Sequence, residues 1–225
     1  MLQQQKKKPT LNPPLDPSKF ATSKYSWEEL KDIIINERFP ILRHVDHETT
    51  YRLYSQKLKR QWKSVYDFVL HCKFDFEKRL IPRDVEDENK SEVKMKSSNG
   101  SSSADVVAAE DVELEVDIPT LPYIESPPRG YVWESFAAHS QTRIKNPQRA
   151  LVMNDFPYYI EDGIEHWCLW KLGDDDVNEI DIKWAKEELN RRSDVVEMMH
   201  WINPVHLKSL PGIDHAHILC LKQKR

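Results

Sequence analysis

Two histidines near the C-terminal end are the residues best suited to chemistry. His215 and His217 lie two residues apart in the run Asp-His-Ala-His-Ile-Leu. The apolar residues that follow predict a strand from His215 to Lys222, and strand side chains alternate between faces, so both imidazoles project the same way. Two adjacent imidazoles can bind a phosphate, attack one, or ligate a metal. Alternatively, one ring caps a loop and the other lines a wet surface, because so short a motif is unspecific.

Other polar residues are predicted to gather around this pair. An Asn-Asp dipeptide ends one strand, a histidine opens the next, and a polar cluster precedes the last strand; such donors suit an anion. The alternative is that the dipeptide forms an Asx turn and that the cluster satisfies loop backbone groups. The predicted substrate-binding residues are Asn154, Asp155, His166, Asn203, Lys208 and Ser209.

Metal and cofactor chemistry are disfavoured by the sequence. His166 could join His215 and His217 in a zinc site, but this spacing is permissive, and we predict no metal and no cofactor. With only five glycines, the chain has no phosphate-cradling loop motif and no Gly-x-Ser-x-Gly nucleophile elbow. The three cysteines lie in apolar runs without a CxxC pair, which is typical of buried thiols in a reducing compartment.

Composition limits the partners that can be expected. The 225 residues carry a net charge of -4, with 39% hydrophobic and 31% charged residues. This charge favours neither nucleic acid nor an anionic membrane, and no apolar run approaches the roughly 20 residues of a transmembrane helix. The polar start of the chain does not resemble a signal peptide. We therefore expect a cytoplasmic protein that is also compatible with the nucleus, and the oligomeric state stays open.

Four segments are predicted along the chain. Residues 1–24 read as a disordered tail, 25–83 as a helical N-terminal part, 84–119 as an acidic, serine-rich disordered linker, and 120–225 as an α+β part. The helical part is small for independent stability, so we expect 25–83 and 120–225 to pack as one unit.

Hydrophobic periodicity predicts the elements that position the candidate residues. Ser26 and Glu29 form a capping box that starts a helix ending before Pro40. A second helix is predicted from Asp46 to Cys72, with a joint near Lys63-Ser64 and a basic face that could bind RNA or phosphate but is interpreted as solvated. Trp133–Phe136 is predicted as a helical turn. Strands are predicted at 150–153, 165–172, 194–201 and 215–222, with a helix at 180–191.

This order predicts an α+β fold. Strands joined by short connections favour an antiparallel sheet with helices on one face, preceded by the N-terminal helical pair.

Several blocks of the sequence resemble the fungal N-acetylglucosamine-induced protein family, a domain of unknown function. The blocks are Ser26–Ile34, Val152–Tyr158, Gly163–His166 and Leu207–Ser209, ahead of the two histidines. The resemblance covers nearly the whole ordered chain and implies a link to amino-sugar metabolism, but no established reaction. The family has Tyr-Gly-Ser where this chain has Trp62-Lys63-Ser64, which puts the helix joint in doubt.

The C-terminal half distantly resembles the histidine-triad nucleotide hydrolases and transferases, which implies a fold of that type. The resemblance places Asp155 at the ribose-binding position. One histidine of three is missing. If Ile213 fills the first place, His215 is the nucleophile; if Leu219 fills the third, His217 is. The implied reaction is attack of an imidazole on a phosphate, with Lys208, Ser209 and His166 as the groups that stabilise phosphate oxygens.

The sequence therefore supports two functions. The first is a protein that binds a phosphorylated small molecule, a nucleotide or a sugar phosphate, in a histidine-lined pocket. His215 and His217 are its candidate catalytic residues. The alternative is a non-catalytic regulatory or interaction protein whose histidines are structural.

Overall fold

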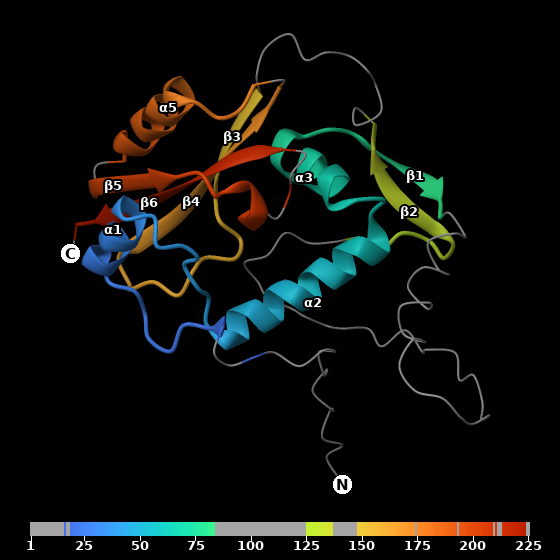
Figure 1. The fold of residues 1–225 in the computed structure, drawn as a ribbon. Helices are drawn as coiled ribbons and strands as arrows, with labels where there is room; N and C mark the ends of the chain where they lie inside the picture. The colour runs from blue at the N-terminus through green and yellow to red at the C-terminus, as the bar shows by residue number, and fades with distance from the viewer. Residues whose placement is uncertain are drawn as a thin grey trace, which may run out of the picture.

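The fold is built on a four-stranded antiparallel sheet in the C-terminal half (Figure 1). The computed structural model describes residues 16, 19–83, 125–136, 148–173, 175–192, 194–208, 210 and 213–223. The strand order is β3-β4-β6-β5, formed by Gln148–Met153, Ile164–Leu172, Asp214–Lys222 and Val195–Trp201. The α+β class and the antiparallel sheet are thus confirmed, and β4 and β6 occupy the centre.

Helix α5, Glu179–Asn190, covers one face of this sheet. Its Ile182 and Leu189 pack with Leu169 of β4 and Ile218 of β6. These strand residues alternate with His215 and His217, so the histidines project from the opposite face. A capping box begins the helix: the Asn178 side chain accepts from the backbone of Asp181, whose carboxylate accepts from the backbone N–H of Asn178.

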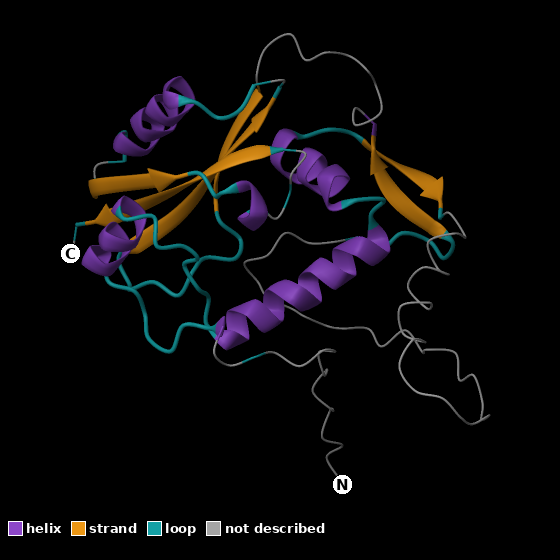
Figure 2. Cartoon of the chain, in the orientation of Figure 1, coloured by secondary structure: helices purple, strands orange, loops and turns teal. Residues whose placement is uncertain are grey.

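The N-terminal helices cover the histidine-bearing face. Helix α1, Trp27–Ile35, starts with the predicted Ser26 and Glu29 capping box, and Trp27 packs with Leu219 and Trp201. Helices α2, Val45–Gln61, and α3, Val65–Phe74, add a second apolar cluster that reaches Leu172 of β4. Helices therefore lie on both faces, with α5 on one and the N-terminal helices on the other (Figure 2).

The second predicted helix is divided at its predicted joint. Trp62 takes an extended backbone conformation and ends α2, and the Ser64 side chain caps α3 by accepting from the Asp67 backbone. Between them, the Lys63 backbone N–H donates to the Trp133 carbonyl oxygen at 2.8 Å. The joint therefore attaches the helical pair to a neighbouring strand.

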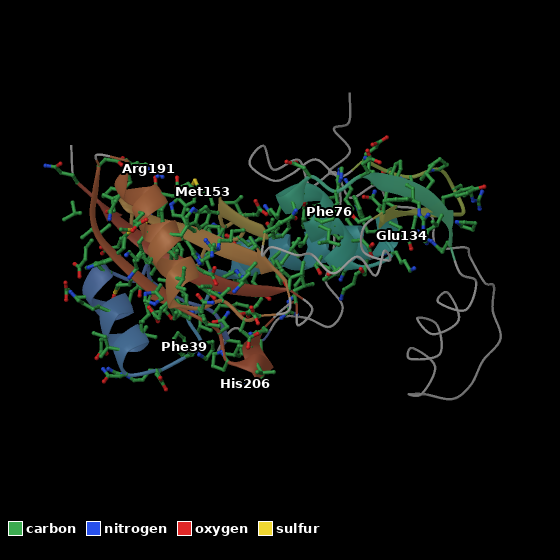
Figure 3. All side chains as sticks on the ribbon, turned by 90° about the horizontal axis from the view of Figure 1, so that it is seen from above. Phe39, Phe76, Glu134, Met153, Arg191 and His206 are labelled. Atoms are coloured by element: carbon green, nitrogen blue, oxygen red, sulfur yellow. The ribbon has the colours of Figure 1, made fainter. Side chains whose placement is uncertain are left out.

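That strand belongs to a two-stranded antiparallel sheet that the sequence did not predict. Strand β1, Lys78–Pro82, pairs with β2, Tyr131–Ser135, away from the main sheet. The predicted helical turn at Trp133–Phe136 is wrong, because Trp133 to Ser135 pair with Leu80 to Lys78. Seen from above, Glu134 on this two-stranded sheet lies at the opposite end of the molecule from Arg191 (Figure 3).

The predicted domain boundaries are not tested by these contacts and stay predictions. Most of the predicted tail and the whole predicted linker lie outside the described residues. Among the described residues, no helix is long and apolar enough to cross a membrane.

Candidate functional site

The candidate site lies where β4 and β6 pair in the centre of the sheet. In the β4–β6 register, Cys168 is opposite His217 and Trp170 is opposite His215, while His166 is opposite Leu219. Since alternate residues share a face, these histidines and Cys168 all project toward the N-terminal helices. The predicted convergence of three imidazoles is therefore present, with a cysteine among them.

His166 and His217 are in direct contact. Nε2 of His166 lies 2.9 Å from Nδ1 of His217, and the Cys168 thiol lies 3.7 Å from the same Nδ1. The Asn154 amide nitrogen is 3.2 Å from Nε2 of His166, while its amide oxygen accepts from the Phe156 backbone in the predicted Asx turn. This strand end therefore places a donor beside the histidine pair.

Asn203 fixes the other side of His217. The Trp201 indole N–H can only donate, and it lies 3.0 Å from the Asn203 side-chain oxygen. The Asn203 amide nitrogen is then the group 2.9 Å from Nε2 of His217. Because an amide NH2 only donates, Nε2 of His217 accepts this hydrogen bond. In the neutral ring the proton consequently sits on Nδ1 and points to His166. Both nitrogens of His217 thus have protein partners.

The three rings are nearly excluded from water and uncharged. Their residues are 2 to 5% exposed. Burial, with a smaller contribution from the charge of Arg43, lowers the pKa of His166 to about 3. Burial also lowers the pKa of His217 well below the usual value of a histidine. It lowers the pKa of His215 below that usual value as well. Neutral imidazoles accept protons or bind metals, so positive charge for an anion must come from elsewhere.

A cavity of about 230 Å³ lies between this face of the sheet and helices α2 and α3. Cys168, His215 and His217 lie at the sheet side. The aromatic residues that line it are Tyr51, Tyr54, Phe68, Phe156 and Trp170. Its cationic residues are Arg43, Lys59 and Lys73.

Two of these cations have carboxylate partners. Lys73 pairs with Asp155 at 2.7 Å, and Arg43 pairs with Glu48 at 3.2 Å. Arg43 also donates to the Phe156 carbonyl oxygen and lies over the Tyr51 ring. Asp155 lines the cavity, but it does so as the partner of Lys73. A ligand oxygen would therefore join existing ion pairs.

His215 differs from His217 in its contacts. Its Nδ1 lies 3.4 Å from the Ile213 carbonyl oxygen, and its ring stacks on Trp170 with 4.5 Å between centroids. A carbonyl only accepts, so Nδ1 carries the proton and Nε2 keeps its lone pair. The geometry thus favours Nε2 of His215, rather than a nitrogen of His217, as the atom available to a ligand.

Lys208 lies apart from the cavity. Lys208 pairs with Asp214 at 2.5 Å, and the same carboxylate accepts from the Val177 backbone at 2.6 Å. Lys208 therefore stabilises the start of β6 and does not line the cavity. Ser209 lies outside the described residues. Of the predicted set, Asn154, Asp155, His215 and His217 line the cavity, and His166 and Asn203 contact His217.

Sequence reasoning missed Cys168 and the cations. The His166-x-Cys168 spacing in β4 repeats the His215-x-His217 spacing in β6, which was the available signal for the thiol. Lys59 belongs to the basic helix face that was interpreted as solvated. Lys73 carried no local signal, since its role depends on a partner in the other half of the chain.

Residues 26–221 match the model of a protein family of unknown function, DUF3605. The chain belongs to this family. A search of curated proteins finds no match. A solved structure titled "Crystal Structure of HTC1" is similar over 88% of this chain and 86% of that chain, with 15% identity and a TM-score of 0.39. A likeness at this level carries no argument about function.

Proposed function

We propose that the cavity binds a compact phosphorylated molecule, with a sugar phosphate as the class of ligand. The observation that supports this proposal is the position of Arg43, Lys59 and Lys73 around a cavity that also contains His215. Charge-assisted hydrogen bonds from such side chains are the strong contacts for phosphate oxygens.

The size of the cavity favours a small ligand. Ligand pockets commonly span roughly 300–1,000 Å³ for drug-sized molecules. At about 230 Å³ the cavity lies below this range, which favours a monosaccharide phosphate over a nucleotide or a nucleotide sugar.

The lining residues divide into two groups by chemistry. The cations would hold the phosphate, while the rings of Tyr51 and Phe156, which contact each other edge to face, would pack against the sugar. The lone pair of His215 Nε2 would accept from a sugar hydroxyl. If the phosphate ester is cleaved, this same nitrogen is the candidate nucleophile or base.

The link to N-acetylglucosamine belongs to this proposal. It rests on the sequence blocks described above, and it makes amino-sugar phosphates the first ligands to test. A cytoplasmic location also belongs to the proposal, because free cysteines and phosphorylated sugars both fit that compartment.

The test is calorimetric titration of the full chain with amino-sugar phosphates, the unphosphorylated sugars, nucleoside monophosphates and inorganic phosphate. We expect the sugar phosphates to bind most tightly. The Lys59→Met variant should weaken binding about tenfold, since it removes one charge-assisted contact. Arg60→Met is the matched control, because Arg60 is the next residue on α2, is exposed and does not line the cavity.

Two results would contradict the proposal. Equal loss of affinity in Lys59→Met and Arg60→Met would indicate general surface charge. Absence of binding by every compound, in a folded protein, would favour the non-catalytic interaction protein instead.

A further inference from the structure

We propose that His166, Cys168 and His217 form a binding site for a thiophilic divalent cation of the zinc type. One side-chain donor atom from each of these residues lies within 4.8 Å of the other two. All three residues are buried, so the group is not a chance cluster of exposed side chains. The site goes beyond the proposed sugar-phosphate site and does not depend on it.

Two of the three donor separations are close to those expected around one shared ion. With Zn–N bonds of roughly 2.0–2.1 Å, a Zn–S bond of about 2.3 Å and tetrahedral angles, ligand nitrogens lie about 3.3 Å apart and nitrogen and sulfur about 3.6 Å apart. The observed nitrogen pair is 2.9 Å apart, and the Cys168 sulfur is 3.7 Å from Nδ1 of His217. The third separation, between the Cys168 sulfur and the donor nitrogen of His166, lies within the 4.8 Å that encloses all three donors, so binding would draw this pair together by up to about 1 Å.

The fold holds these atoms on a rigid scaffold. Strand β4 is paired with both β3 and β6, and β6 with both β4 and β5, so neither ligand strand is at an edge. Cys168 is directly opposite His217, and His166 lies two residues earlier on the same face. Ligands on central strands are positioned more accurately than ligands on loops.

The donor types select the cation. Thiolate and imidazole ligands favour zinc over magnesium or calcium, which prefer oxygen ligands. Three protein ligands leave a fourth position open, as in catalytic zinc sites. Cys168 and His217 both line the cavity, so the three donors lie beside it. On binding, the Cys168 thiol forms a sulfur–metal bond and releases its proton to the buffer.

Asn203 weakens this site. If His217 coordinates through Nδ1, its proton moves to Nε2, which then needs an acceptor. The structure instead places the Asn203 amide nitrogen there, because the amide oxygen is bound to the Trp201 indole. An aspartate at this position would accept from both groups. We therefore expect Asn203→Asp to bind zinc about 10- to 100-fold more tightly than the wild type, the range typical of such supporting contacts.

The test uses the full chain without a polyhistidine tag, stripped with a chelator and titrated with zinc by calorimetry. We expect one equivalent to bind, with proton release. Cobalt(II) should produce the near-ultraviolet charge-transfer band of a cobalt–thiolate bond. The band should persist in Cys72→Ala/Cys220→Ala, which retains Cys168 as its one cysteine, and disappear in Cys168→Ala.

Three results would overturn the metal site. They are no zinc binding by folded wild type and folded Asn203→Asp, no thiolate band with cobalt, or a band that survives Cys168→Ala. Sugar-phosphate binding is measured separately by the Lys59 and Arg60 variants, so either proposal can fail while the other stands.

Discussion

The side chains of Trp201 and His217 are joined through one amide: Asn203 accepts from the indole N–H at 3.0 Å and donates to the imidazole at 2.9 Å. The two rings are also stacked, with centroids 4.9 Å apart. Because the indole cannot accept, this contact orients the amide and with it the proton of His217. One loop residue thus determines which nitrogen of a buried histidine carries hydrogen.

Removal of this amide should destabilise the protein. In Asn203→Ala the Trp201 N–H and Nε2 of His217 lose their partner in a largely buried place, so we expect the free energy of unfolding to fall by about 1–3 kcal/mol. Urea denaturation measures the change. Asn190→Ala, at an exposed position near the end of α5, is the control and should change stability by less than about 0.5 kcal/mol. Equal effects in the two variants would contradict the assigned role of Asn203.

The charges of two buried carboxylates, Asp181 and Glu134, should contribute differently to the free energy of unfolding. Asp181 pairs with Lys171, whose side chain is 2% exposed, whereas Glu134 pairs with Lys63 and Arg79, which are 41% and 50% exposed. Asp181→Asn leaves a buried ammonium without a counter-charge and should cost about 3–5 kcal/mol. In Glu134→Gln the cations can be solvated, so we expect about 1–2 kcal/mol. Chemical denaturation of both variants tests this order, and a larger loss in Glu134→Gln would contradict it.

Asp181 should also make the stability of the protein depend on pH in the acidic range. Burial raises its pKa, but hydrogen bonds from Lys171 and the Asn178 backbone, together with the charge of Arg149, outweigh burial and hold the pKa below its usual value. A lowered pKa in the folded state means that the stabilisation is complete above the unfolded pKa of roughly 3.9 and is lost as pH falls through the folded value. The difference in unfolding free energy between wild type and Asp181→Asn should therefore shrink below about pH 4. A constant difference from pH 7 to pH 3 would show that this carboxylate does not titrate as described.

The cysteines should be poorly reactive in the folded protein. Burial raises the pKa of Cys168 and Cys220 to about 12 and that of Cys72 to about 11. Since the thiolate is the reactive form, alkylation near pH 8 should be slow at all three sites and fastest at half-buried Cys72. Mass spectrometry of samples alkylated with iodoacetamide, folded and in denaturant, gives the rates. Rapid modification of folded Cys168 would show that this face of the sheet is open.

The main sheet could be predicted because its strands carry their own signal. β4 and β6 are long apolar runs, and α5 has both a capping residue and helical periodicity. The two-stranded sheet could not be predicted, since Lys78–Pro82 contains two cations and a proline, and Trp133 pairs with Leu80 only across a long stretch of intervening sequence. A local pattern does not report such a partner.

The candidate site was predictable to the same degree. Strand alternation placed His215 and His217 together, and the pairing of β4 with β6 brought in His166. The position of Lys208 was not predictable, because a short ion pair with Asp214 directs it away from the cavity. The burial of the rings also depends on packing by the N-terminal helices, which the sequence of the C-terminal half does not encode.

The two sides of the cavity are held by different forces. On one side, continuous backbone hydrogen bonds join β4 to β6. On the other, α2 reaches the sheet through side chains such as Tyr54 and Leu58. Separating the strands would break several backbone hydrogen bonds together, whereas moving α2 away from the main sheet mainly rearranges side-chain contacts. The rate at which a small molecule enters should consequently follow the packing at Tyr54 and Leu58, and enlarging or trimming these residues should alter association rates.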